Sequence, residues 1–179
     1  MSTPAADVKT PGVPAHEHKA KAPARVRCYL ITVSDTRTEA TDASGLLARQ
    51  AVAAAGHEVS GYRIITDDPG EVSALVRKVC NEGQADAVIL NGGTGIARRD
   101  STYEAIVSLL DKRLDGFGEL FRMLSFQDIG SAAMLSRAVG GTVGKTCVFA
   151  LPGAPDAVKL GLERLILPEL GHLVAEMRK

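Results

Sequence analysis

Apolar, β-branched runs alternate with helical apolar patterns along this sequence, and that alternation limits the possible folds more than any other feature. The helical pattern is clearest where Val72, Leu75, Val76 and Val79 recur at i, i+3, i+4 and i+7. Strands are expected at residues 26–34, 58–66, 85–91 and 146–152. Strands that are apolar on both faces and joined by helices predict an α/β fold: a three-layer, mostly parallel twisted sheet with helices on both faces.

The helices of this fold have recognisable limits in the sequence. One is expected to end at Gly56, another to start near Thr102, and the C-terminal one to be broken at Pro168. With 179 residues the chain suits a single domain, expected over residues 25–179. Residues 1–24 are rich in Pro, Ala and Lys and are expected to form a disordered tail.

A metal site in this tail is not expected. His16 and His18 could bind a metal in principle, but no third ligand is near, so a chance pair is favoured.

The overall composition indicates a small-molecule partner. The 21 basic and 21 acidic residues cancel, which argues against binding to nucleic acid or to an anionic membrane. Cys28, Cys80 and Cys147 each lie in an apolar run without metal-site or disulfide spacing, and are expected to be buried, reduced thiols. No apolar run reaches the roughly 20 residues that a membrane span needs, and no secretory signal is apparent. We expect a soluble, cytoplasmic protein.

The segment GGTVGKT (140–146) resembles a phosphate-binding P-loop, but two observations argue against that assignment. A P-loop needs a glycine where this chain has Val139, so the segment is one residue short. It also precedes a strand, whereas a P-loop joins a strand to the N-terminus of a helix. We therefore expect a glycine-rich turn that leads into the fourth parallel strand.

Ligands of open parallel sheets bind beyond the carboxyl ends of the strands, so the loops that follow strands are the candidate site. These loops hold many of the chain's Gly, Asp, Ser and Thr residues, and we expect them to converge at one sheet edge. They span residues 34–45, 66–70, 91–102 and 151–156.

The third of these loops carries the clearest signal. Gly92, Gly93, Thr94 and Gly95 allow the backbone to present several N–H groups to an anion, and two arginines follow at 98–99. The alternative is a flexible crossover connection, because GGTG alone is a weak motif.

The acidic residues beside this loop also have two interpretations. Asp67 and Asp100 could hold Mg²⁺ together with substrate phosphates. Alternatively, Asp67 forms a turn, and Asp100 precedes a helix in which Ser101 and Glu104 form a capping box. Asp42 is in addition a candidate N-cap. Acidic residues beside an anion-binding loop favour a metal-phosphate site as the single explanation for the group.

Several motifs agree in order and spacing with a known family. They are SDTR, DASG, ILNGGTGIARRDSTYEAI, GFGELFRMLSFQDIGSAAMLSRAVGG and LPGAP. Together they resemble the MoaB/MogA molybdenum cofactor biosynthesis family, the molybdopterin adenylyltransferases, from about Val26 to the C-terminus. The segment FGELFRMLSFQDIG is most similar to the MoaB branch. Some members of that branch lack equivalents of Asp67 or of Arg98-Arg99-Asp100, whereas this chain has them.

The resemblance implies a fold, an activity and a set of site residues. The fold is that of molybdenum cofactor biosynthesis proteins, and the activity is Mg²⁺-dependent transfer of AMP from ATP to the phosphate of molybdopterin, which releases pyrophosphate. The resemblance implies Asp67 and Asp100 as catalytic and Mg²⁺-binding residues. Implied substrate-binding residues are Ser34, Asp35, Asp42, Gly92, Gly93, Thr94, Gly95, Arg99, Ser136, Arg137, Pro152, Gly153 and Pro155.

The resemblance also implies a homo-oligomer, a trimer or a hexamer, with other molybdenum cofactor assembly proteins as possible partners. Two alternatives stay open. One is a non-catalytic molybdopterin-binding carrier or scaffold, and the other is an unrelated nucleotide-binding α/β protein.

Overall fold

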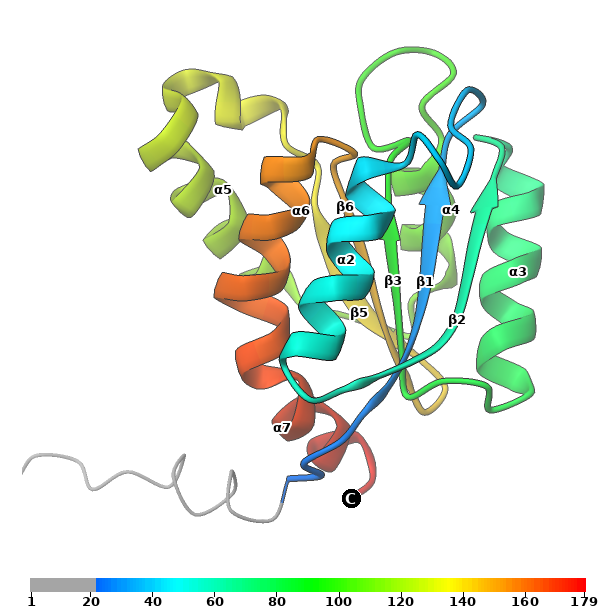
Figure 1. The fold of residues 1–179 in the computed structure, drawn as a ribbon. Helices are drawn as coiled ribbons and strands as arrows, with labels where there is room; N and C mark the ends of the chain where they lie inside the picture. Colours follow the sequence, from blue (N-terminus) through cyan, green and yellow to red (C-terminus); the bar gives the residue numbers. More distant parts are fainter. Residues whose placement is uncertain (1–21) are drawn as a thin grey trace, which may run out of the picture.

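The computed structural model describes residues 22–179 and confirms the three-layer α/β fold (Figure 1). Its six strands have the order β2-β1-β3-β6-β5-β4. The parallel strands are β1 (Arg27–Val33), β2 (Glu58–Ile65), β3 (Ala87–Asn91) and β6 (Thr146–Leu151). The antiparallel strands are β5 (Val139–Val143), which pairs with β6, and β4 (Lys112–Arg113), which pairs with β5.

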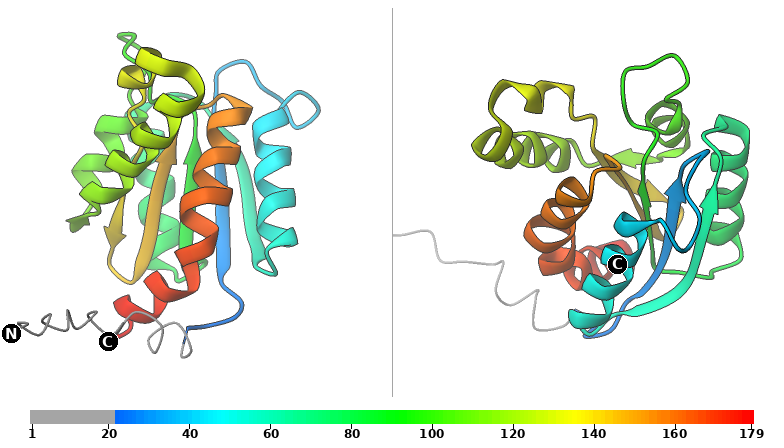
Figure 2. Two further views of the ribbon diagram at one scale, coloured as in Figure 1. Left: turned by 90° about the vertical axis from the view of Figure 1, so that its left-hand side faces the viewer. Right: turned by 45° about the horizontal axis from the view of Figure 1, so that its top comes forward.

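Helices cover both faces of the sheet (Figures 1 and 2). On one face lie α2 (Ala43–Ala54), α5 (Asp115–Ile129), α6 (Pro155–Gly161) and α7 (Leu167–Met177); on the other lie α3 (Pro69–Asn81) and α4 (Thr102–Leu109). Side chains of a strand alternate between the faces, so Leu30 belongs to the apolar cluster that contains Phe121, and Ile31 to the one that contains Ile106. Both layers are therefore closed by apolar packing.

The segment GGTVGKT forms a β-hairpin, so the expectation of a simple turn before β6 is corrected. Gly140 and Gly141 lie in β5, and only Gly144, at φ +57°, lies in the turn. A Cβ on Gly140 would lie 2.6 Å from the Phe149 ring, and one on Gly141 would collide with the carbonyl oxygen of Lys112. The glycines are needed here for close approach within the sheet.

The C-terminal helical segment is not broken at Pro168, which corrects a second expectation. Leu162–Ile166 form a π-helical turn between α6 and α7, and Pro168 lies in the first turn of α7. The N–H of Leu167 bonds to the carbonyl of Leu162, five residues back. A wide turn accommodates a proline, which has no N–H and whose ring crowds the carbonyl four residues before it.

The predicted tail lies almost entirely outside the described residues, and so do His16 and His18. Of its last residues, Pro23 lies against α7, where a Cβ added to Gly171 would be 2.7 Å from the Pro23 carbonyl oxygen. Within residues 22–179 no helix is both long enough and apolar enough to cross a membrane.

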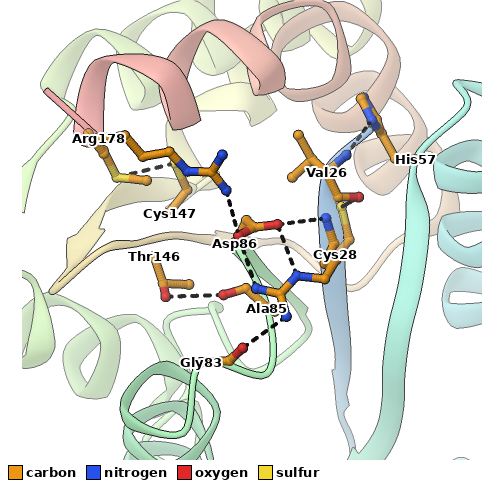
Figure 3. A network of polar contacts seen from close by, with 11 residues as sticks. Val26, Cys28, His57, Gly83, Ala85, Asp86, Thr146, Cys147 and Arg178 are labelled. Atoms are coloured by element: carbon orange, nitrogen blue, oxygen red, sulfur yellow. Dashed lines mark hydrogen bonds and ion pairs between the residues drawn. The ribbon is translucent and has the colours of Figure 1, made fainter. Parts of the chain in front are cut away.

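A polar network ties the C-terminus to the edge of the sheet where the parallel strands begin (Figure 3). Asp86 accepts hydrogen bonds from Nε and Nη2 of Arg27 at 3.2 and 3.1 Å, and from Nη2 of Arg178 at 3.1 Å. Arg27 also donates to the carbonyl of Gly83 at 3.0 Å. One carboxylate thus joins β1, the approach to β3 and the end of α7.

The three cysteines are free thiols; Cys28 and Cys147 are buried, as expected, whereas Cys80 is only partly buried, which corrects the expectation for that residue. Burial raises the pKa of Cys28 and of Cys147 to about 12, so neither forms a reactive thiolate at neutral pH.

Candidate functional site

The four loops that follow parallel strands meet at one edge of the sheet, as expected (Figure 2). The N–H of Asp67 donates to the Asp35 carboxylate at 3.0 Å, which joins the loops after β1 and β2. The N–H of Gly92 donates to the Leu151 carbonyl at 3.0 Å, which joins those after β3 and β6. Because β1 lies between β2 and β3, this edge includes the switch point where such sheets bind ligands.

The glycine loop after β3 requires its glycines. Gly92 and Gly93 have φ values of +99° and +64°, which other residues rarely adopt. A Cβ on Gly93 would overlap Oγ1 of Thr102 and lie 2.7 Å from a carboxylate oxygen of Asp67. The N–H groups of residues 93–96 contact no acceptor within the described chain, which leaves consecutive donors for an anion.

Asp67 and Asp100 flank this loop, and each keeps one carboxylate oxygen without a partner in residues 22–179. Oδ1 of Asp67 accepts from the backbone N–H of Ser101 at 3.2 Å and from its hydroxyl at 3.0 Å, and lies 3.4 Å from Oγ1 of Thr102. Oδ2 of Asp100 accepts from the N–H of Ala97 at 3.0 Å. The second oxygen of each carboxylate remains able to bind a cation.

Asp35 has both oxygens engaged by protein groups. One accepts from the N–H of Asp67 and the other forms an ion pair with Arg99. The Arg99 side chain is 65% exposed, so this pair lies at the surface of the site.

Asp42 is the N-cap of α2, as the sequence suggested. It is only 3% exposed; one oxygen accepts from the N–H of Gly45 at 2.8 Å and the other from the hydroxyl of Tyr62. Burial and the bond to Asp42 raise the pKa of Tyr62 to about 12. The structure therefore gives Asp42 a clear role in fixing the start of α2.

The capping box, one of the two interpretations of the sequence at the start of α4, does not form. The Ser101 hydroxyl donates to Asp67 and makes no cap bond in its own helix. The Glu104 carboxylate binds Arg137, with Nη1 at 2.5 Å from Oε1. Ser101 and Glu104 instead bond to residues of other segments of the site. Capping of α4 therefore does not account for these two residues.

The remaining predicted residues lie around the same edge in supporting positions. Oγ of Ser34 accepts from the N–H groups of residues 36 and 37 at 3.3 and 3.2 Å, which shapes the loop after β1. Half-buried Pro152 and exposed Gly153 follow β6, and a Cβ on Gly153 would be 3.2 Å from Cα of Gly92. Pro155 is the first residue of α6, and Ser136 directly follows the 3₁₀ turn η1 (Gly130–Leu135).

Arg137 binds the glycine loop itself. Its Nε donates to the carbonyl of Thr94 at 2.9 Å, and its Nη2 donates to the carbonyl of Gly95.

The sequence did not single out Ser44 and Tyr62, and it gave Ser101 and Thr102 only a local role at the start of a helix, whereas all four make contacts within the site. Ser44 donates to the Gly153 carbonyl at 2.7 Å and is part of the DASG motif. Ser101 and Thr102 directly follow Arg-Arg-Asp, so their position was a usable signal. Tyr62 lies in a strand with no local sign of its contact to Asp42.

A cavity of about 470 Å³ opens beside these groups, a volume typical of small-molecule sites. Its lining residues are Pro69, Ile96, Ala97, Arg98, Asp100, Ser101, Glu104 and Arg137. Residues 22–179 contain no cluster of three or more acidic, His or Cys side chains that could hold a metal alone. The donor chemistry nevertheless suits Mg²⁺, which proteins often bind through one or two carboxylates together with substrate phosphates.

Comparison with known proteins identifies the family. Residues 29–172 match the family model MoCF_biosynth, described as a probable molybdopterin binding domain. The chain belongs to this family. Two relatives, both named molybdenum cofactor biosynthesis protein B, come from Bacillus cereus, at 52% identity, and Bacillus subtilis, at 54% identity. Each alignment covers 91% of this chain, with 97% of the B. cereus protein and 96% of the B. subtilis protein.

Solved structures of similar proteins share the fold. A crystal structure described as molybdenum cofactor biosynthesis protein B has a TM-score of 0.85 and 52% identity, over 88% of this chain and 99% of that one. The tungsten cofactor synthesizing protein MoaB from Pyrococcus furiosus has a TM-score of 0.79 and 40% identity, over 88% of this chain and all of its own. The MoaB/MogA resemblance and the fold class are both confirmed.

Proposed function

We propose that this protein acts in molybdenum cofactor biosynthesis as a molybdopterin adenylyltransferase, transferring AMP from ATP to the phosphate of molybdopterin. The observation that carries the proposal is that two carboxylates with one free oxygen each lie beside a row of amide donors without an acceptor in residues 22–179. Asp67 and Asp100 each keep one oxygen for a cation, beside the N–H groups of residues 93–96. Phosphoryl transfer depends on such positioning and charge neutralisation.

The reaction balances without a general base. A phosphate oxygen of molybdopterin attacks the α-phosphorus of ATP, the new P–O bond forms, and the bond to the β-phosphate oxygen breaks to release pyrophosphate. The attacking phosphate is largely ionised at neutral pH because its second pKa is about 6. This explains why the chemistry needs no catalytic histidine or cysteine.

Different residues of the site would bind the metal ion, the phosphates and the pterin. Asp67 and Asp100 would hold Mg²⁺, which neutralises phosphate charge when bound. The N–H groups of the glycine loop would bind phosphate oxygens, and exposed Arg99 would supply positive charge at the entrance. Ser34, Ser136 and residues 152–155 would shape the walls of the pterin site.

The homo-oligomer, a trimer or a hexamer, and contacts with other molybdenum cofactor assembly proteins belong to the same proposal. Its support is the family membership together with a group of exposed apolar side chains on α5 and η1.

The decisive experiment is a coupled assay with purified protein, molybdopterin, ATP and Mg²⁺, which follows pyrophosphate release and the adenylylated product. Asp67→Asn and Asp100→Asn should each abolish turnover, while molybdopterin binding survives. Asp111→Asn is a matched control, because Asp111 accepts a bond from the hairpin residue Gly144 at 2.7 Å and lies outside the site. Its turnover should equal that of the wild type.

A different result would support the alternative function. If the wild-type protein binds molybdopterin but releases no pyrophosphate with ATP and Mg²⁺, the protein is a carrier or scaffold. Binding of ATP without any affinity for molybdopterin would indicate an unrelated nucleotide-binding protein.

A further inference from the structure

Arg137 has most of its hydrogen-bonding capacity committed to protein groups. Besides its bonds to the carbonyls of Thr94 and Gly95, Nη1 donates to Oε1 of Glu104 at 2.5 Å and Nη2 lies 3.3 Å from Oε2. The guanidinium carbon also lies 4.8 Å from the centre of the Tyr103 ring. The side chain is only 25% exposed. A guanidinium used in this way has little left to offer a phosphate.

The bonds from Arg137 fix the direction of two peptide groups. In a planar trans peptide the C=O and the N–H point in opposite directions, and the described chain contains no cis peptide. The carbonyls of Thr94 and Gly95 point to Arg137, so the N–H groups of Gly95 and Ile96 point away from it. These two N–H groups are among those without an acceptor in residues 22–179.

We propose that Arg137 is a positioning residue, which holds the glycine loop so that the N–H groups of Gly95 and Ile96 face a substrate phosphate. Glu104 and Tyr103 in turn hold the guanidinium. The identity of the phosphate rests on the proposed function, whereas the contact between Arg137 and the loop does not.

The ionisation state of the Glu104 carboxyl group agrees with this arrangement. The hydrogen bond from Arg137 is the main reason that the pKa of Glu104 lies below its ordinary value. Glu104 is therefore ionised at neutral pH, as a charge-assisted bond to a guanidinium requires.

Two variants separate positioning from direct substrate binding. Lysine at position 137 keeps the charge but cannot reach two carbonyls and a carboxylate together, because it lacks the planar fork of arginine. Glutamine at position 104 leaves Arg137 in place but removes the charge that holds it. If Arg137 contacted phosphate directly, Glu104→Gln would leave ligand affinity unchanged or raise it.

Limited proteolysis tests the contact without any assay of activity. Arg98 and Arg99 are exposed trypsin sites within the loop that Arg137 holds. In Arg137→Met and Glu104→Gln, native trypsin cleavage after these residues should rise roughly tenfold, the effect of losing about 1.5 kcal/mol of charge-assisted bonding. The control Glu58→Gln removes an exposed ion pair with Arg25 and should leave the rate unchanged. Wild-type cleavage rates in both loop variants, with unchanged thermal midpoints, would overturn the proposal.

Affinity for ATP with Mg²⁺, measured by calorimetry, tests the consequence for the ligand. Both Arg137→Lys and Glu104→Gln should weaken binding by about tenfold, because each misplaces the same N–H groups. Binding by Glu104→Gln that equals or exceeds the wild type would show direct contact and overturn the positioning role. If wild-type protein binds no ATP, the proposed function fails, and the proteolysis result still decides whether Arg137 holds the loop.

Discussion

The oxygens of four aspartates at the candidate site have different partners, although the side chains are chemically identical. Asp35 and Asp42 have both oxygens engaged by protein groups, while Asp67 and Asp100 each have one oxygen without a partner among the described residues. A carboxylate with a free oxygen can bind a cation, whereas a saturated one holds structure. The contacts therefore favour the proposal that Asp67 and Asp100 hold the cation, and they show Asp35 and Asp42 bound by neighbouring protein groups.

A substitution at Gly93 should damage this arrangement directly. Alanine there would take an unfavourable positive φ and overlap Thr102 and Asp67, so Gly93→Ala should lose at least about 1–2 kcal/mol of folding free energy and all ATP binding. Gly116→Ala is the control, because its Cβ would meet open space at the start of α5. Urea denaturation and calorimetry measure both effects; equal stability and ATP affinity in the two variants would contradict the prediction.

For individual residues, the sequence was a good guide to which ones lie at the site. It was a poor guide to the contacts that each of them makes. The GGTG loop and the acids could be placed because residues that follow parallel strands must share one edge. The partners of Arg137 could not, because they are 33 to 43 residues away in the sequence and depend on side-chain directions that no local pattern encodes. The same is true of Tyr62 and Asp42.

Strands and helices were predictable where their apolar periodicity was strong, and the misses have physical causes. The parallel strands are continuous apolar runs, whereas β5 contains two glycines and β4 has only two residues. Gly-Gly usually indicates a turn, and only the packing of Phe149 and β4 against that backbone makes it a strand. Likewise, proline usually ends or kinks a helix, and its presence at position 168 gives no sign of the π-helical turn that lets α6 continue into α7.

At the scale of secondary-structure elements, the contacts that attach α7 to the sheet should contribute measurably to stability. Asp86 joins β1, β3 and α7, and its side chain is only 14% exposed. Asp86→Asn should cost about 2 kcal/mol of unfolding free energy at pH 7, because charge-assisted bonds to Arg27 and Arg178 are lost. In contrast, Glu58→Gln at an exposed pair should cost less than about 0.5 kcal/mol.

The stabilisation that Asp86 contributes should decrease as the pH falls. Burial raises the pKa of Asp86, but the bonds and charges of Arg27 and Arg178 more than offset this, so the pKa is lowered. Its stabilisation is then full above the unfolded value of about 3.9 and declines as the pH falls through the folded pKa below it. The difference between wild type and Asp86→Asn in urea denaturation should stay constant from pH 7 to 5 and narrow below pH 4. A difference that grows with acid would contradict this.

At the scale of the molecule, a group of large apolar side chains is exposed within residues 22–179. They lie on α5 and the η1 turn that follows it, and they are Leu120, Met123, Phe126, Ile129, Met134 and Leu135. Such groups are typical of interfaces. The segment ends directly before Ser136 and Arg137, so we expect that a subunit packed on it would also steady Arg137 and the glycine loop.

If the proposed homo-oligomer buries this surface, Phe126→Ser should dissociate it. Phe126 is 61% exposed in the single chain, so serine should leave the fold intact but remove about 2 kcal/mol of apolar contact per subunit. Light scattering after gel filtration should show a smaller species at micromolar concentration, and trypsin should cleave faster after Arg98 and Arg99 because η1 is no longer held. Leu46→Ser, a similarly exposed position on α2, should change neither. If the oligomer survives Phe126→Ser unchanged, the subunits meet through another surface. If the dissociated variant is cleaved in the loop at the wild-type rate, oligomer formation does not stabilise the glycine loop.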